Sequence, residues 1–147
     1  MGKFLGIDYG KKRIGLAITD DSKIISSPLY TVLNSEIFSF LEDFFKKEEI
    51  ERIVIGIPKR LDNSNNVIVK DIHTFSKKIL TTFNIPIYFI DERYTSKIAS
   101  TIIINSHLKK IKRRNKQLVD KVSASLILET YLNLIKNNNN DFTHFHI

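Results

Sequence analysis

The chain has 147 residues, a net charge of +7 and a hydrophobic content of 42%. These values are typical of a soluble globular protein, and we expect one domain over residues 1–136 and a flexible, asparagine-rich tail over residues 137–147. The absence of cysteine excludes disulfides and thiolate metal sites. Asp8 interrupts the first apolar run, and no later stretch is long enough to span a bilayer. We therefore expect a cytoplasmic protein that does not enter a membrane.

Three strands are expected in the first part of the chain. Residues 3–9 form a mainly apolar run, and residues 14–19 alternate bulky with small side chains, which is typical of a strand. The link between these two runs is short enough for a hairpin. A third strand is expected over residues 23–32, at a sheet edge or broken near Pro28.

The pattern then changes to helices that alternate with apolar strands. Asn34 or Ser35 is expected to cap the first of these helices, and Asn84 with Pro86 to end the second. The expected elements are a helix over residues 37–45, a strand over 52–57, a helix over 68–83, a strand over 87–90, and helices over 95–103 and 118–135. Three meandering strands followed by parallel crossovers predict an α/β fold with a five-stranded mixed sheet flanked by helices.

The positive charge is concentrated in one segment, residues 109–116. Its six basic residues are Lys109, Lys110, Lys112, Arg113, Arg114 and Lys116, and no acidic residue interrupts them. Without this segment the net charge falls from +7 to +1. A basic patch of this kind attracts polyanions through phosphate contacts and counterion release, so we expect a nucleic acid as partner. A lysine-rich composition is the alternative explanation, but it accounts less well for a local cluster with two arginines.

Three acidic residues far apart in the sequence are candidates for one metal site. Asp8 and Glu92 each follow an apolar strand, where an α/β sheet binds its ligands. Asp120 lies near the start of the last helix, and the small residues 123–125 would let that helix lie close to the sheet. Oxygen ligands favour hard cations, so we expect one or two Mg²⁺ or Mn²⁺ ions. Two such ions about 4 Å apart can activate water for phosphodiester cleavage.

Each acid also has a simpler interpretation. Asp8 alone could form a turn, Glu92 could lie in a solvated loop with a local ion pair, and Asp120 could favour the helix dipole. Basic residues lie near these acids in the sequence, notably Lys12, Arg13 and Arg93. Together they predict a rim of phosphate-binding groups around an acidic pocket.

Four segments resemble the YqgF/RuvX family of RNase H-like proteins, which are described as pre-16S rRNA nucleases and Holliday-junction-resolvase homologues. The segments are Gly6–Ala17, Val54–Pro58, Asp91–Ser96 and Val119–Ala124. The resemblance implies an RNase H-like fold, a role in maturing the 5′ end of 16S rRNA, and metal-ligand roles for Asp8, Glu92 and Asp120. The sequence departs from the family at Asp62-Asn63-Ser64, where Asp-Gly-Ser is usual.

These observations leave three functions open. The first is a metal-dependent endonuclease acting on precursor or structured rRNA. The second keeps the chemistry but acts on branched DNA, where a resolvase should work as a two-fold dimer; the sequence leaves monomer and homodimer open. The third is an RNA-binding module without catalysis, which predicts a steep salt dependence and no metal requirement.

Overall fold

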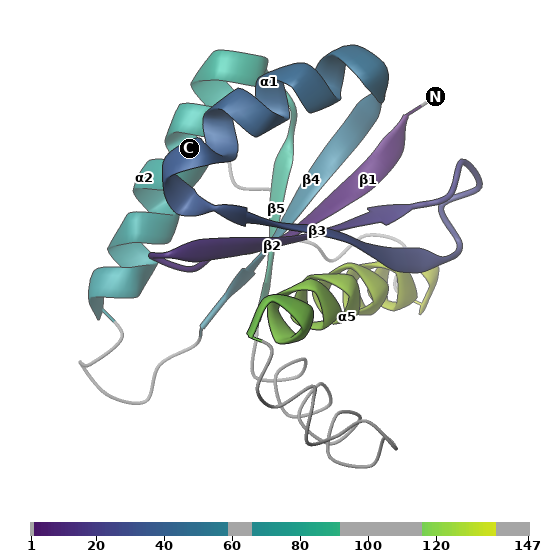
Figure 1. Ribbon diagram of the computed structural model, residues 1–147. Helices are drawn as coiled ribbons and strands as arrows, with labels where there is room; N and C mark the ends of the chain where they lie inside the picture. The colour runs from purple at the N-terminus through teal and green to yellow at the C-terminus, as the bar shows by residue number, and fades with distance from the viewer. Residues whose placement is uncertain (1, 59–65, 92–115, 138–147) are drawn as a thin grey trace.

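A computed structural model of the protein describes residues 2–58, 66–91 and 116–137 (Figure 1). The described elements are, in chain order, β1 (Lys3–Asp8), β2 (Arg13–Thr19), β3 (Ser26–Leu33), a short 3₁₀ helix η1 (Asn34–Glu36), α1 (Ile37–Lys47), β4 (Ile50–Ile57), α2 (Asn66–Phe83), β5 (Ile87–Asp91) and α5 (Lys116–Asn137).

The five strands form one mixed sheet with the order β3-β2-β1-β4-β5. β2 pairs antiparallel with both β1 and β3, whereas β1 pairs parallel with β4 and β4 pairs parallel with β5. The expected five-stranded mixed sheet is therefore confirmed. Because β1, β4 and β5 run in the same direction, their carboxyl ends meet at one edge of the sheet.

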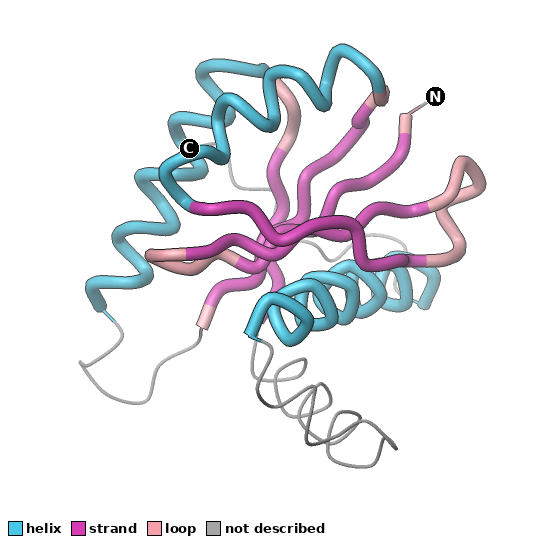
Figure 2. The backbone as a smooth tube through the Cα atoms, in the orientation of Figure 1, coloured by secondary structure: helices cyan, strands magenta, loops and turns pink. Residues whose placement is uncertain are grey.

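Helices cover both faces of this sheet, and each face has its own core. Figure 2 shows α1 and α2 together on one side and α5 alone on the other. Leu5, Ile7 and Ile55 belong to the larger core beneath α1 and α2, whereas Phe4 and Val54 belong to the smaller core beneath α5. The two sets alternate along β1 and β4, as the two-residue period of a strand requires.

The expected third strand is displaced by a turn. β3 begins at Ser26 and not at residue 23, because the carboxylate of Asp20 accepts the backbone N–H groups of Ile24 and Ile25 at 2.8 and 3.0 Å. Lys23 has a φ of 59° in this turn. The expectation of an edge strand with an irregularity near Pro28 is confirmed, since β3 ends the sheet and its register with β2 shifts between Leu16 and Ala17.

The expected cap of the first helix is wrong. Neither η1 nor α1 has a side-chain cap, and the Asn34 side chain instead donates to the carbonyl oxygen of Gly10. The expected end of the second helix is confirmed, because Asn84 has a φ of 55° and donates its N–H to the Leu80 carbonyl at 2.9 Å. The expected helix over residues 95–103 and most of the expected tail lie outside the described residues. Among the described helices, none is long and apolar enough to cross a membrane.

Candidate active site

The carboxyl edge of the parallel strands collects residues that the sequence places far apart. β1 ends at Asp8, β4 at Ile57 and β5 at Asp91. The register pairs Ile7 with Ile55 and Ile57 with Asp91, so the three strands end at nearly the same level. This edge is where open α/β sheets hold their ligands.

Alternation along β1 decides which face Asp8 occupies. Phe4 packs beneath α5, Leu5 and Ile7 pack beneath α1 and α2, and Gly6 faces α5. The partly buried Asp8 therefore belongs to the α5 face of the sheet. The carboxylate at the end of β1 thus lies on the face that only α5 covers among the described helices.

Gly6 lets α5 approach β1 very closely. A Cβ atom on Gly6 would lie 2.9 Å from the carbonyl oxygen of Ala124 and 2.9 Å from the Cβ of Leu128, both too close for a real side chain. The small residues on the helix contribute too, because Ser125 lies against β3, where Ser26 Oγ donates to its carbonyl oxygen at 2.8 Å. The expectation that small residues let this helix lie close to the sheet is confirmed.

The contacts between α5 and β1 also determine the direction of the helix along the strand and which residues of the two lie side by side. Phe4 lies edge-on to Tyr131 with ring centroids 5.8 Å apart, and Gly6 two residues later lies against Ala124 and Leu128. α5 therefore runs against the direction of β1, toward the carboxyl edge as its residue numbers fall. Two strand residues advance about 6.6 Å and one helical turn about 5.4 Å. Position 120, one turn before Ala124, is thereby brought toward the end of β1.

A partly buried polar contact holds the other half of α5. Arg52 on β4 donates from Nη1 to the Tyr131 hydroxyl at 2.7 Å, and its guanidinium lies over the rings of Phe4 and Tyr88 at 5.1 and 5.2 Å. Burial raises the pKa of Tyr131 above its usual value, although the hydrogen bond from Arg52 acts in the opposite direction. This contact anchors α5 at the amino ends of β1 and β4, away from the candidate site.

The turn between β1 and β2 is held at several points. A Cβ on Gly10 would collide with the carbonyl oxygen of Arg13, so this turn requires glycine for space. The side chain of Asn34 donates to the Gly10 carbonyl at 2.8 Å, and its N–H donates to the Lys12 carbonyl at 2.9 Å. On the other side, Tyr9 packs against Phe75 of α2 with centroids 4.9 Å apart.

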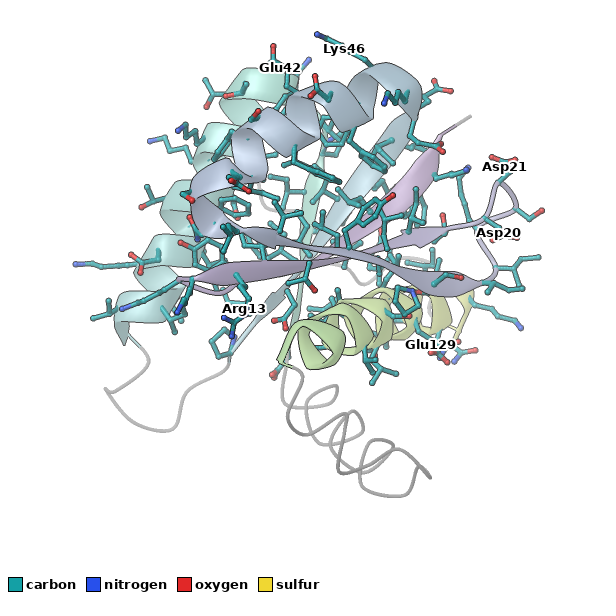
Figure 3. The ribbon with its side chains drawn as sticks, viewed as in Figure 1. Arg13, Asp20, Asp21, Glu42, Lys46 and Glu129 are labelled. Carbon is teal, nitrogen blue, oxygen red and sulfur yellow. The ribbon has the colours of Figure 1, made fainter. Side chains whose placement is uncertain are left out.

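This turn carries basic residues to the same edge as Asp8. Lys11 and Lys12 are exposed, and Lys11 Nζ lies 4.0 Å from the Asp71 carboxylate on α2. Arg13 begins β2 two residues before Gly15, the partner of Asp8, and alternation with Ile14 puts Arg13 on the α5 face. Figure 3 shows Arg13 at the edge of the sheet near the start of α5.

Some of the expected site residues are not placed by the structure. Asp8, Lys12 and Arg13 are placed at one edge, and Asp120 is placed only as a backbone position in α5. The others lie outside the described residues, namely Glu92, Arg93, Lys109, Lys110, Lys112, Arg113 and Arg114. Within residues 2–58, 66–91 and 116–137, no group of three acidic, histidine or cysteine side chains is assembled for a metal.

Two residues that hold the elements around this site gave no signal of that role in the sequence. In the sequence Asn34 resembles a helix cap, and only the folded chain brings it to the β1–β2 turn. Arg52 resembles an ordinary surface charge at the start of an apolar strand, and its partner Tyr131 is 79 residues away. A single sequence offers no pattern that links such distant partners.

Comparison with known proteins gives concordant results. The family model described as "RuvX: Holliday junction resolvase" matches residues 2–134. A protein of Christiangramia forsetii named "Putative pre-16S rRNA nuclease" is 46% identical over 121 residues, which cover 82% of this chain and 90% of that protein. A Porphyromonas gingivalis protein of the same name is 44% identical, with coverage of 82% and 88%.

Solved structures share the fold at low sequence identity. The structure "T. thermophilus RuvC in complex with Holliday junction substrate" matches with a TM-score of 0.60 and 13% identity, covering 97% of this chain and 100% of that chain. The fowlpox virus resolvase bound to Holliday junction DNA matches with a TM-score of 0.55 and 14% identity, covering 90% and 98%. At these identities the likeness concerns the fold.

Proposed function

This chain belongs to the RuvX family, and from that premise we propose that it is a metal-dependent endonuclease that processes the 5′ end of pre-16S rRNA. The names of its relatives support pre-16S rRNA as the substrate, since two proteins 46% and 44% identical to it are named "Putative pre-16S rRNA nuclease". Asp8, Glu92 and Asp120 form the catalytic site in this proposal. Lys12 and Arg13 bind the substrate backbone, together with Arg93 and the basic segment at 109–116.

The observation that best supports the proposal is the close approach of α5 to β1 at Gly6. It brings the helix backbone against the strand two residues before Asp8. The next helical turn toward the amino end of α5 holds position 120. In the proposal the Asp120 carboxylate reaches the same pocket as that of Asp8, and a larger residue at Gly6 would prevent this.

The alternation of side chains along β5 supports Glu92, and not its neighbour Asp91, as the proposed metal ligand. Ile87 and Phe89 pack beneath α1 and α2, whereas Tyr88 and Ile90 pack beneath α5. Asp91 therefore continues the α1/α2 set. A strand continued by one residue would place Glu92 in the α5 set, on the same face as Asp8.

The donor chemistry fits a hard divalent cation. Asp8 is a partly buried carboxylate at the carboxyl edge of the sheet, and the two partners proposed for it offer only oxygen ligands. Mg²⁺ or Mn²⁺ held by Asp8, Glu92 and Asp120 would supply an activated water and a counter-charge for the leaving oxygen. A cation would also offset the repulsion among three carboxylates in one partly dry pocket.

The residues of the chain bind and orient the substrate in this proposal. Arg13, on the α5 face near Asp8, holds a phosphate oxygen beside the scissile bond, where a guanidinium can make two parallel hydrogen bonds. Lys12 binds an adjacent phosphate from the β1–β2 turn. The partial burial of Asp8 limits the access of bulk water and strengthens these charge interactions.

A cleavage assay on a pre-16S rRNA fragment tests the proposed activity. We expect Mg²⁺- or Mn²⁺-dependent cleavage by the wild type and a loss of at least about 100-fold in Asp8→Asn, because one metal ligand is removed. Glu129→Gln is the matched control, since this exposed acid lies on α5 beyond the site (Figure 3). Undiminished metal-dependent cleavage by Asp8→Asn would refute the site assignment.

Calorimetry tests the metal site without reference to activity. Mn²⁺ titrated into the wild type should give a saturable heat, and Asp120→Asn should weaken binding by about 10-fold or more. Glu129→Gln should bind as the wild type does. Equal Mn²⁺ affinity in wild type and Asp120→Asn would remove Asp120 from the ligand set.

Branched DNA is a second candidate substrate, favoured by the family's description as a Holliday junction resolvase. A resolvase cutting two strands together would act as a two-fold dimer. Cleavage of a four-way DNA junction should then be compared with cleavage of the rRNA fragment, with the oligomeric state measured by gel filtration. Preferential junction cleavage by a dimer would favour this candidate over rRNA processing.

A further inference from the structure

The contacts of Asn34 are unusual for a residue that precedes a helix. Its side chain is partly buried and donates to the Gly10 carbonyl at 2.8 Å, while its own N–H donates to the Lys12 carbonyl at 2.9 Å. Asn34 thus closes two hydrogen bonds to one turn, from a position 24 residues away in sequence from Gly10. It caps no helix, because η1 and α1 have no side-chain cap.

The turn held by Asn34 is the one that carries Lys11 and Lys12. At its start, Tyr9 packs on Phe75 of α2. At its end, Arg13 pairs with Leu33 in the β2–β3 ladder, which puts Asn34 directly beyond the last strand pair. The turn is therefore attached to α2 on one side and to the end of β3 on the other.

We propose that Asn34 is a positioning residue for substrate binding, which holds the β1–β2 turn so that Lys11 and Lys12 meet the phosphate backbone of a nucleic acid. The inference rests on the proposed function, because it assumes a polyanionic substrate at this edge. Lysine side chains are long and lose much conformational freedom on binding. A turn whose backbone is already fixed adds no further loss of conformational entropy when the lysines bind the nucleic acid.

The hydrogen-bond donor on Asn34 is the decisive atom. The Gly10 carbonyl is an acceptor, so the amide nitrogen of Asn34 satisfies it. Asn34→Asp keeps the size and the backbone N–H but turns an oxygen toward that carbonyl, which replaces an attraction by a repulsion. Ser35→Ala is the matched control, since Ser35 is exposed on the same 3₁₀ helix.

The position of Asp8 should be far less affected by the substitution of Asn34. It pairs with Gly15 in the β1–β2 ladder, and its neighbour Ile7 pairs with both Leu16 and Ile55. These ladders do not involve Asn34. The inference therefore predicts an effect on binding of the substrate and little effect on the chemical step.

The test measures binding of a fluorescent pre-16S rRNA fragment by anisotropy, without divalent metal, over a range of salt concentrations. We expect Asn34→Asp to raise Kd about 5- to 10-fold, a loss equivalent to a few weakened hydrogen-bonded contacts. Its slope of log K against log salt should become shallower by about 0.7 to 0.9 for each phosphate contact that is lost. In cleavage assays KM should rise, with kcat within about 3-fold of the wild type.

A double-mutant cycle separates positioning from a general structural role. In a background lacking both lysines, Lys11→Ala with Lys12→Ala, the uncharged change Asn34→Ala should have no further effect on Kd, because it removes the donor without adding a charge that repels RNA. Ser35→Ala should bind as the wild type does. If Asn34→Asp does not fold, Asn34→Ala removes the same donor without adding a charge and takes its place.

Wild-type affinity and salt slope in Asn34→Asp would overturn the inference, as would an undiminished effect of Asn34→Ala in the background without the two lysines. RNA binding that depends on Asn34 in a protein without metal-dependent cleavage would refute the proposed nuclease while supporting the positioning role. A wild type that binds no RNA would overturn both.

Discussion

The carbonyl oxygen of Ala124 lies 2.9 Å from the point that a Cβ atom on Gly6 would occupy. This one relationship sets the distance between α5 and β1. It therefore also sets how near the start of α5 comes to the carboxyl end of β1.

Replacing Gly6 by alanine should displace α5 from the sheet. The new methyl group would meet both the Ala124 carbonyl and the Leu128 Cβ, so we expect a destabilisation of about 1–3 kcal/mol. Cleavage should fall by more than the loss of folded protein explains, because the shift moves position 120 relative to Asp8. Urea denaturation and rRNA cleavage measure the two effects. Unchanged stability would show that the helix accommodates the methyl group, contrary to this packing.

Substitutions of two neighbouring acids, Asp91 at the end of β5 and Glu92 after it, should differ sharply in their effect on cleavage. Asp91 continues the face beneath α1 and α2. The proposed function assumes that the alternation continues past Asp91, which would put Glu92 on the face of Asp8. We expect Glu92→Gln to reduce cleavage by at least about 100-fold, and Asp91→Asn to change it by less than about 3-fold. The two variants remove the same charge, so each controls for the other. The reverse order of effects would mean that the strand alternation does not continue past Asp91.

Tyr131 should contribute to stability through its hydroxyl group. Tyr131→Phe removes the oxygen that accepts from Arg52 Nη1 at 2.7 Å and leaves the partly buried guanidinium with one acceptor fewer. We expect a loss of about 1–3 kcal/mol in the free energy of unfolding. Thr130→Val is a useful comparison, since the Thr130 hydroxyl donates only to the Leu126 carbonyl of its own helix. A Tyr131→Phe variant as stable as wild type would show that the contact with Arg52 has no net value.

The turn before β3 should make stability depend on pH in the acid range. The backbone N–H groups of Ile25 and then Ile24 lower the pKa of Asp20 below its ordinary value of 3.8. The folded protein therefore binds this proton less readily than the unfolded chain, and the carboxylate stabilises the fold at pH values above about 3.8. This contribution is lost as the pH falls through the lowered pKa of the folded state.

Asp20→Asn tests this assignment, because an amide does not titrate. The wild type should lose stability more steeply than Asp20→Asn between about pH 5 and about pH 2, as followed by urea midpoints. An NMR titration of the Asp20 carboxyl group should give a midpoint below 3.8. Parallel pH profiles for the two proteins would contradict the proposed role of the two N–H groups.

The alternation and helical spacing of the sequence determined most of the described elements, because these periods arise from contacts within a few residues. They predicted β1, β2, β4 and β5. Pro28 predicted the edge position of β3, and Asn84 with Pro86 predicted the end of α2, which lies at Phe83. They also placed Asp8 at a strand end. Local competition explains the errors, since the Asp20 side chain bound the N–H groups that an earlier β3 would have used.

Only the tertiary structure decided which distant residues meet. The composition of the last helix indicated that it could approach a sheet, but the contact of Ala124 with Gly6 selected the face of β1 that it covers. Asn34 carries the local signal of a helix cap, yet it binds the β1–β2 turn because β3 ends beside that turn. Arg52 and Tyr131 likewise became partners only when two cores packed on opposite faces of one sheet. Such contacts depend on the shape of the whole chain, and local periodicity contains no information about them.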